Sequence, residues 1–125
     1  MIVLDSSALI ALLRGEKGAE MVAMLLEGSC LSTVNLSEVL TKSNEWGRNP
    51  IEVLNEIEAL PVVILPATVE QALTAALLRP LTRSAGLSLG DRLCLALALS
   101  LGCPALTADS AWKGLPHNVE VRFIR

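Results

Sequence analysis

The chain has 125 residues, enough for one domain with a single hydrophobic core, and we expect a single domain over residues 1–125. Its net charge of −3 excludes a protein that binds nucleic acid through a general basic surface. The richest apolar stretch begins at Leu93 and has about nine residues, against roughly twenty for a membrane-spanning helix. The start of the chain also lacks the basic segment of a secretion signal, so we expect a soluble, cytoplasmic protein without a membrane partner.

Hydrophobic residues make up 52% of the chain, yet it holds one Phe, two Trp and no Tyr, so aliphatic side chains must form the core. So much apolar surface on a small domain favours a subunit or partner interface, and we expect a homodimer. The cysteines form no CxxC pair, which argues against a disulfide framework and against a thiolate metal site; they are Cys30, Cys94 and Cys103.

The predicted elements alternate along the chain. Short apolar or β-branched runs predict strands at residues 2–4, 29–33, 62–65, 104–107 and 119–124. Helical patterns occur at residues 7–13, 16–28, 36–46, 51–60, 68–79 and 88–102, and glycine or proline closes or follows most of them. Strands that are apolar throughout and alternate with helices are typical of a parallel sheet covered on both faces. The sequence therefore predicts an α/β fold, a three-layer α/β/α domain with a central parallel sheet.

Four acidic residues are predicted to lie at the edge of the sheet where ligands bind. Asp5 ends the first strand and Asp109 follows the fourth, while Glu38 and Asp91 lie in the first turns of predicted helices. The carboxyl ends of the strands and the starts of the following helices share one edge, and ligands bind in the crevice there. Carboxylates that converge in one crevice repel one another unless a cation neutralises them.

Each acid also has an ordinary explanation as a helix-start residue. Asn35 stands three residues before Glu38, and Ser88 three residues before Asp91, which is the spacing of a capping box. The other two acids stand where N-caps are found. One such acid would be interpreted as a cap, but four at the same edge favour a cation site.

The ligand type selects the cation. Carboxylates alone suit Mg²⁺ or Mn²⁺, and the chain offers no set of His and Cys ligands for Zn²⁺. The only histidine, His117, is predicted to be a surface loop residue. A chain with one histidine cannot be a ribonuclease that uses two histidines as acid and base. Metals held by carboxylates at such an edge suit phosphoryl chemistry, in which an ion activates water and stabilises the charge of the scissile phosphate.

The sequence resembles the PIN domains, and among them the VapC-type toxins of bacterial and archaeal toxin–antitoxin pairs. The resemblance covers essentially the whole chain, and the order and spacing of its motifs carry it. The motifs are VLDSSALIALL with Asp5, NLSEVL with Glu38, SLGDRLCLALA with Asp91, and LTADSAW with Thr107 and Asp109.

The resemblance implies that the four acids form a catalytic pocket that holds Mg²⁺ or Mn²⁺. Asp5 and Asp91 would be the principal ligands, and Glu38 and Asp109 would act directly or through water. Two hydroxyl residues at the matching positions, Ser6 and Thr107, would orient carboxylates or the water ligands of the metal. Capping by Ser6 and a plain strand-end role for Thr107 remain open as alternatives.

The activity implied by the resemblance is endonucleolytic cleavage of RNA, with a cognate antitoxin that blocks the site. Basic residues near the motifs are candidates to position substrate phosphates: Lys42 lies one turn beyond Glu38, Arg92 adjoins the third acid, and Lys113 follows the LTAD motif. An i,i+4 ion pair with Glu38 would explain Lys42 equally well. Trp112 is predicted to pack in the core.

Other protein classes also place acids at strand ends. A haloacid-dehalogenase-like phosphatase would need a second Asp two residues after the first, where the chain has Ser7. A phospho-receiver domain would need an acid pair near the first strand and a lysine after a late strand, and neither is evident. Two alternatives stay open: a nuclease that acts on DNA through the same pocket, and a non-catalytic interaction module whose acids are only caps.

Overall fold

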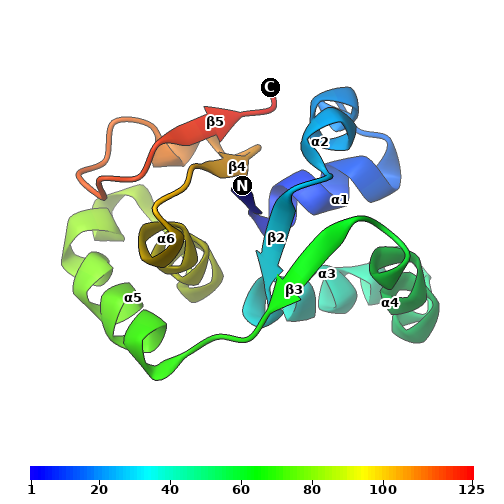
Figure 1. Ribbon diagram of the computed structural model, residues 1–125, viewed down its shortest axis with the longest axis horizontal. Coiled ribbons are helices and arrows are strands. Elements are labelled where there is room, and N and C mark those ends of the chain that lie inside the picture. The colour runs from blue at the N-terminus through cyan, green and yellow to red at the C-terminus, as the bar shows by residue number, and fades with distance from the viewer.

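The computed structural model describes residues 1–125, and at its centre lies a five-stranded sheet in which all neighbouring strands are parallel (Figure 1). The strand order is β3-β2-β1-β4-β5. The chain starts in the middle of the sheet, adds two strands on one side and then crosses to the other, so the order reverses between β1 and β4. The strands are β1 (Ile2–Leu4), β2 (Ser29–Ser32), β3 (Val62–Leu65), β4 (Ala105–Thr107) and β5 (Val121–Phe123).

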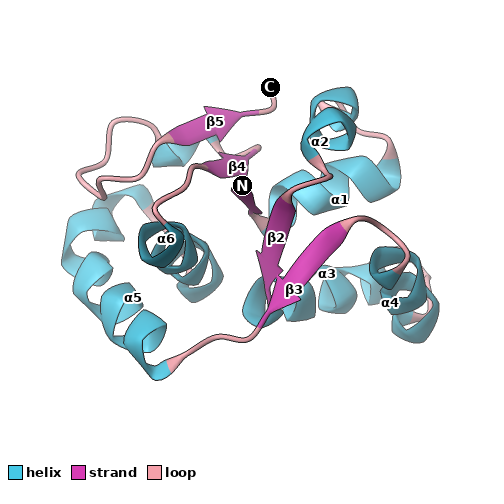
Figure 2. Cartoon of the chain, viewed as in Figure 1, coloured by secondary structure: helices cyan, strands magenta, loops and turns pink.

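Helices cover both faces of the sheet, α1 to α4 on one side and α5 and α6 on the other (Figure 2). The predicted three-layer α/β/α fold with a parallel sheet is thereby confirmed. None of the helices has the length and apolar content that crossing a membrane requires. The helices are α1 (Ser6–Arg14), α2 (Ala19–Leu25), α3 (Thr33–Glu45), α4 (Pro50–Glu58), α5 (Val69–Thr82) and α6 (Leu89–Leu101), with short 3₁₀ turns at Arg83–Ala85 and Ser110–Trp112.

The first strand shows why the strands are apolar throughout. Ile2 and Leu4 belong to the core beneath α1 to α4, whereas Val3 points the other way into the core beneath α5 and α6. Since successive side chains of a strand face opposite sides, a strand covered on both faces needs apolar residues at every position. Aliphatic side chains fill both layers, as the composition predicts.

The third helix begins earlier than predicted. Ser32 is its N-cap and accepts a hydrogen bond from the backbone N–H of Val34 at 3.2 Å, so α3 starts at Thr33. Glu38 therefore lies in the second turn of the helix. The predicted capping box between Asn35 and Glu38 is wrong, because Ser32 and not Asn35 is the N-cap of the helix.

Two other helices differ in length from the prediction. The second starts only after Gly18, whose φ of 96° requires glycine and whose missing side chain makes room for Ile124. The fifth continues past Pro80 to residue 82. Proline removes one helical hydrogen bond, to the carbonyl of Ala76, and Ala76 is exposed, so water can replace that bond.

The prediction that His117 lies on the surface is wrong. Its side chain is 5% exposed, and its Nδ1 accepts a hydrogen bond from the backbone N–H of Val119 at 3.1 Å. Its Nε2 lies 3.2 Å from the carbonyl oxygen of Trp112. The histidine thus joins two parts of the loop before β5, and Trp112 beside it is completely buried, as predicted.

Candidate active site

A cavity of about 660 Å³ opens at the carboxyl edge of the sheet, where the strand order reverses. Ligand sites of open α/β sheets occur at this place. All four acids predicted for this edge line the cavity, although they come from four separate parts of the chain; they are Asp5, Glu38, Asp91 and Asp109.

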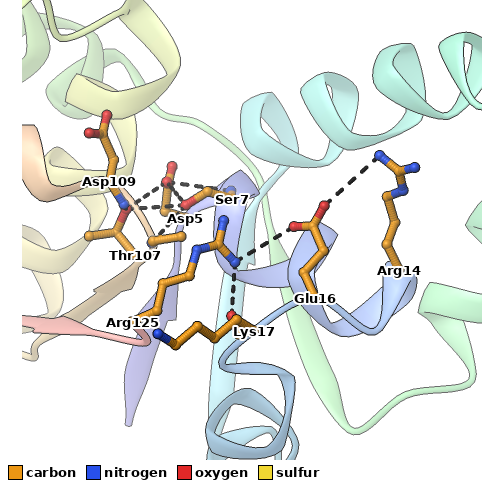
Figure 3. A network of polar contacts seen from close by, with 9 residues as sticks. Asp5, Ser7, Arg14, Glu16, Lys17, Thr107, Asp109 and Arg125 are labelled. Carbon is orange, nitrogen blue, oxygen red and sulfur yellow. Dashed lines mark hydrogen bonds and ion pairs between the residues drawn. The ribbon is translucent and has the colours of Figure 1, made fainter.

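Asp5 is 3% exposed, and all the hydrogen bonds of its side chain fall on one carboxylate oxygen. Ser7 Oγ donates to Asp5 Oδ2 at 2.6 Å, and Thr107 Oγ1 donates to the same oxygen at 2.9 Å (Figure 3). The other oxygen, Oδ1, is buried without a partner. Burial raises the pKa of Asp5 from 3.8 to about 6, against the opposing hydrogen bond from Ser7. An unpaired buried carboxylate oxygen is costly unless a proton or a cation meets it.

Glu38 is fixed by a second network, which joins three helices. Ser6 Oγ of α1 donates to Glu38 Oε1 at 2.5 Å, and Asn35 Nδ2 donates to the same oxygen at 2.9 Å. Asn35 is completely buried, and its Nδ2 also lies 3.1 Å from the carbonyl oxygen of Gly90 in α6. The position of Glu38 therefore depends on the packing of α1, α3 and α6 together.

Gly90 has a steric role beside this network. A Cβ added to Gly90 would lie on top of the carboxyl group of Glu38. No side chain fits there, so glycine lets α6 approach the Glu38 carboxylate closely. The same approach places Asp91, the next residue, in the cavity.

Asp91 and Asp109 are held by their own helix starts. The backbone N–H of Ser88 donates to Asp91 Oδ2 at 2.9 Å, and Ser88 Oγ accepts from the backbone N–H of Asp91 at 3.1 Å, which confirms that capping box. Burial raises the pKa of Asp91, and the charges of Glu38 and Asp109 raise it further, while the hydrogen bonds from Ser88 oppose this. Asp109 is exposed, and its Oδ1 accepts from the backbone N–H of Ala111 at 2.9 Å.

The donor set fits Mg²⁺ or Mn²⁺, since it consists of carboxylate oxygens and includes the unpaired Oδ1 of Asp5. As the side chains stand, however, no three Asp, Glu, His or Cys residues are close enough to hold an ion. The capping contacts of Asp91 and Asp109 explain this, because each aims a carboxylate oxygen at a backbone N–H.

The family model of the PIN domain matches residues 2–118 of the sequence. The chain belongs to the PIN domain family. PIN domains are nucleases, and the cavity of this PIN domain is lined by the acids of the four motifs that carry the resemblance. A comparison with curated protein sequences finds no match.

Several solved structures share the fold of this chain. A toxin–antitoxin complex from Klebsiella pneumoniae has a TM-score of 0.78 at 18% identity, over 100% of this chain and 98% of that one. DNA-bound VapBC from Salmonella typhimurium has a TM-score of 0.75 at 15% identity, over 99% and 98%. FitAcB from Neisseria gonorrhoeae has a TM-score of 0.73 at 23% identity, over 99% and 98%. These likenesses cover the whole PIN domain and show its fold.

Of the three basic residues predicted to position substrate phosphates, only one lines the cavity. Lys42 lines the cavity with the acids. Arg92 does not, because its Nη1 donates to the carbonyl oxygen of Ala75 at 2.9 Å and its guanidinium faces α5. Lys113 is exposed and lies outside the cavity lining. The hydroxyl residues Ser6 and Thr107 contact different acids, Glu38 and Asp5 respectively.

Three residues that position the acids were not predicted. Ser7 was overlooked beside Ser6, although the second residue after an Asp often bonds back to it. Asn35 stands one helical turn before Glu38, on the same face of α3. Gly90 interrupts a strongly helical pattern, and such a glycine indicates close approach of another group.

Proposed function

We propose that this PIN domain is a metal-dependent endoribonuclease and the toxin of a toxin–antitoxin pair that acts in the cytoplasm. The observation that carries the proposal is the unpaired Oδ1 of Asp5, buried in a cavity that three further acids line. In a family of nucleases, such an oxygen is best explained as a ligand of a divalent cation.

Each residue of the site has a part in this proposal. Asp5 and Asp91 would be the main ligands of Mg²⁺ or Mn²⁺, with Glu38 and Asp109 acting directly or through water. When bound, the ion lowers the pKa of water and neutralises charge on the scissile phosphate. The chain orients the carboxylates: Ser7 and Thr107 hold Asp5. Ser6 and Asn35 hold one oxygen of Glu38, which leaves the other oxygen for the cavity. Lys42 would contact a neighbouring phosphate.

Cleavage assays test the proposal. The purified protein should cut RNA with Mg²⁺ or Mn²⁺ and be inactive in EDTA. The products should carry a 5′-phosphate and a 3′-hydroxyl, because water and not the ribose 2′-hydroxyl attacks. Asp5→Asn should be inactive. Glu45→Gln is the matched control, since Glu45 lines the same cavity outside the acid cluster, and it should stay active. A 2′,3′-cyclic phosphate product would contradict the mechanism.

The two alternatives have their own readouts. Parallel assays on RNA and DNA of the same sequence decide the substrate, and efficient cutting of DNA alone would favour a DNA nuclease. Titration with Mn²⁺ decides whether the acids are only caps. Specific binding that is lost in Asp5→Asn supports a metal site, whereas no specific binding would favour a non-catalytic interaction module.

We expect an antitoxin chain to block the cavity. The supporting observation is its charge: an Arg or Lys of a partner, placed among the four acids, would form charge-assisted hydrogen bonds and compete with the metal. One structure that shares the fold, from Klebsiella pneumoniae, is described as a toxin–antitoxin complex. Replacing every Arg and Lys of the partner segment that blocks the cavity by alanine should abolish inhibition, and unchanged inhibition would contradict this part of the proposal.

The homodimer has a candidate interface on α5. Val69, Leu73, Leu77 and Leu81 are spaced by four residues and lie on one face of the helix, and their exposed fractions run from 47% to 83%. A stripe of this kind is typical of a face that another subunit covers. Leu77→Glu should give a monomer by light scattering. Met24→Glu, at an exposed methionine in α2, is the control and should leave the dimer intact.

A further inference from the structure

The cavity has a second wall beside the acids, built from three parts of the chain. Arg14 ends α1, Trp46 follows α3, and Arg125 follows β5, and all three line the same cavity as the acids. Glu16 lies between the two arginines, 3.9 Å from Arg14 and 3.7 Å from Arg125 (Figure 3). We call Arg14, Trp46 and Arg125 the rim. It is an aromatic and cationic surface next to a site for phosphates.

Arg14 and Trp46 form a stacking surface. The guanidinium carbon of Arg14 lies 4.9 Å from the centre of the Trp46 ring, and Arg14 keeps 48% of its side chain exposed. The only other tryptophan, Trp112, is completely buried in the core. In a chain with so few aromatic residues, Trp46 is thus the one indole at a cavity wall. Unpaired bases stack on aromatic rings and on guanidinium planes.

Arg125 is positioned but keeps free donors. Its Nη1 donates to the carbonyl oxygen of Lys17 at 2.8 Å, and the contact with Glu16 is longer than a hydrogen bond. A guanidinium has five N–H donors, so most of them stay available to a phosphate. Its side chain is 34% exposed, which leaves it open to the cavity.

Building on the proposed function, we propose that the rim binds one unpaired nucleotide of the RNA next to the cleaved bond. The base stacks on the Arg14–Trp46 surface, and the phosphate of that nucleotide is bound by Arg125. The cleaved phosphate itself lies at the acids.

The size and chemistry of the rim define the class of substrate. The whole cavity, with its acids and its rim, has a volume of about 660 Å³, which is in the range of small-ligand sites and gives room for a nucleotide. A base inside a duplex is already stacked on its neighbours and cannot reach the rim. The enzyme should therefore select single-stranded RNA, such as a loop.

Fluorescence of Trp46 gives a direct test. The full chain is titrated in EDTA, where the proposed function predicts no cleavage, with an RNA of about ten nucleotides, single-stranded or in a duplex. Only the single strand should change the tryptophan emission, since Trp112 is shielded in the core. Binding measured by anisotropy of a labelled RNA should weaken about tenfold in Trp46→Ala and in Arg14→Lys, which loses the stacking plane.

Two variants separate the stacking role from a structural one. Trp46→Phe keeps an aromatic face and should keep most of the binding. Arg122→Ala removes an exposed arginine outside the cavity, paired with Glu120 at 3.3 Å, and should bind RNA as the parent does. Arg125→Ala should reduce the slope of log Kd against log salt by about 0.7, the value for one phosphate contact in a single strand.

The outcomes distinguish this inference from the proposed function. If the parent cuts RNA with Mg²⁺ and Trp46→Ala does so with an unchanged KM, the rim proposal fails and the proposed function stands. If the parent cuts no RNA, the proposed function fails, and the binding data still decide whether the rim takes a nucleotide. Equal binding of duplex and single strand would overturn the proposal, as would variants that weaken only the binding of a partner chain.

Discussion

The four acids of the cavity fall into two pairs that are held in different ways. Asp5 and Glu38, the inner acids, each accept a hydrogen bond from a near neighbour in the sequence. Each also accepts one from a distant partner, Asp5 from Thr107, 102 residues away, and Glu38 from Ser6, 32 residues away. Asp91 and Asp109, the outer acids, bond to backbone N–H groups two or three residues away. The distant contacts thus fix the inner pair through the fold, whereas local capping contacts hold the outer pair.

The first and largest expected effect concerns activity. If the inner acids are the rigid part of the metal site, Asp5→Asn should lower RNA cleavage at least about 100-fold, more than the loss of a group that only orients a ligand. Asp109→Asn should cost about tenfold, because an exposed and movable carboxylate is easier to replace by water. Initial rates at saturating Mn²⁺ measure this difference, and equal losses would remove the distinction between the pairs.

The second prediction concerns stability against pH in EDTA. The unfolded chain releases the proton of Asp5 near pH 3.8, whereas the native state holds it to about pH 6, so native stability falls as pH rises through this window. Asp5→Asn lacks this cost. It should be more stable than the parent above pH 6, by roughly 3 kcal/mol at most, and should show no gain below about pH 4. Urea unfolding at both ends of the window measures the difference.

Metal and a second variant sharpen this result. Millimolar Mg²⁺ or Mn²⁺ should stabilise the parent more than Asp5→Asn, because binding to the native state alone raises its stability. Asp91→Asn should melt higher than the parent in EDTA, since the pKa of Asp91 is also raised by burial, but its gain is reduced by damage to its capping box. A variant less stable in EDTA and equally responsive to metal would make Asp91 only a helix-start acid.

The third prediction addresses the support of Glu38. Asn35→Asp preserves shape but replaces the donor that faces Glu38 Oε1 with an acceptor. Cleavage should fall about tenfold or more, with a weaker apparent affinity for Mn²⁺. Asn44→Asp is the matched control, since it makes the same change on an exposed position of the same helix, and it should leave both values unchanged. An active Asn35→Asp with normal metal affinity would show that the network is only structural.

The smallest expected effect concerns the outer pair. Ser88→Ala removes the hydroxyl that caps α6 and should cost about 1 kcal/mol of stability. Cleavage should change little, because Asp91 keeps its place in the first turn of the helix. Denaturant unfolding and cleavage rates on the same preparation test this. A large loss of activity with little loss of stability would mean that capping, too, positions the metal site.

Local signals in the sequence predicted much of the fold. All five strands and all six helices were found, because apolar runs and closing glycine or proline residues act over a few neighbours. The errors were also local. With Ser32 as its N-cap, α3 begins about one turn before the predicted start. Pro80 does not end α5, because Ala76, whose carbonyl loses its helical hydrogen bond, is exposed to water. His117 was misplaced because burial depends on packing partners that its own loop does not reveal.

For the site, the sequence by itself determined which acids exist and that they share one edge, since a parallel sheet aligns its carboxyl ends whatever the details of packing. It also determined the capping box of Asp91, which needs only four consecutive residues. Only the tertiary structure decided that Ser6 bonds to Glu38, that Gly90 makes room for Glu38, and that Arg14 and Arg125 flank the same cavity. These relations join residues dozens of positions apart, and helix packing, not local chain geometry, brings them together.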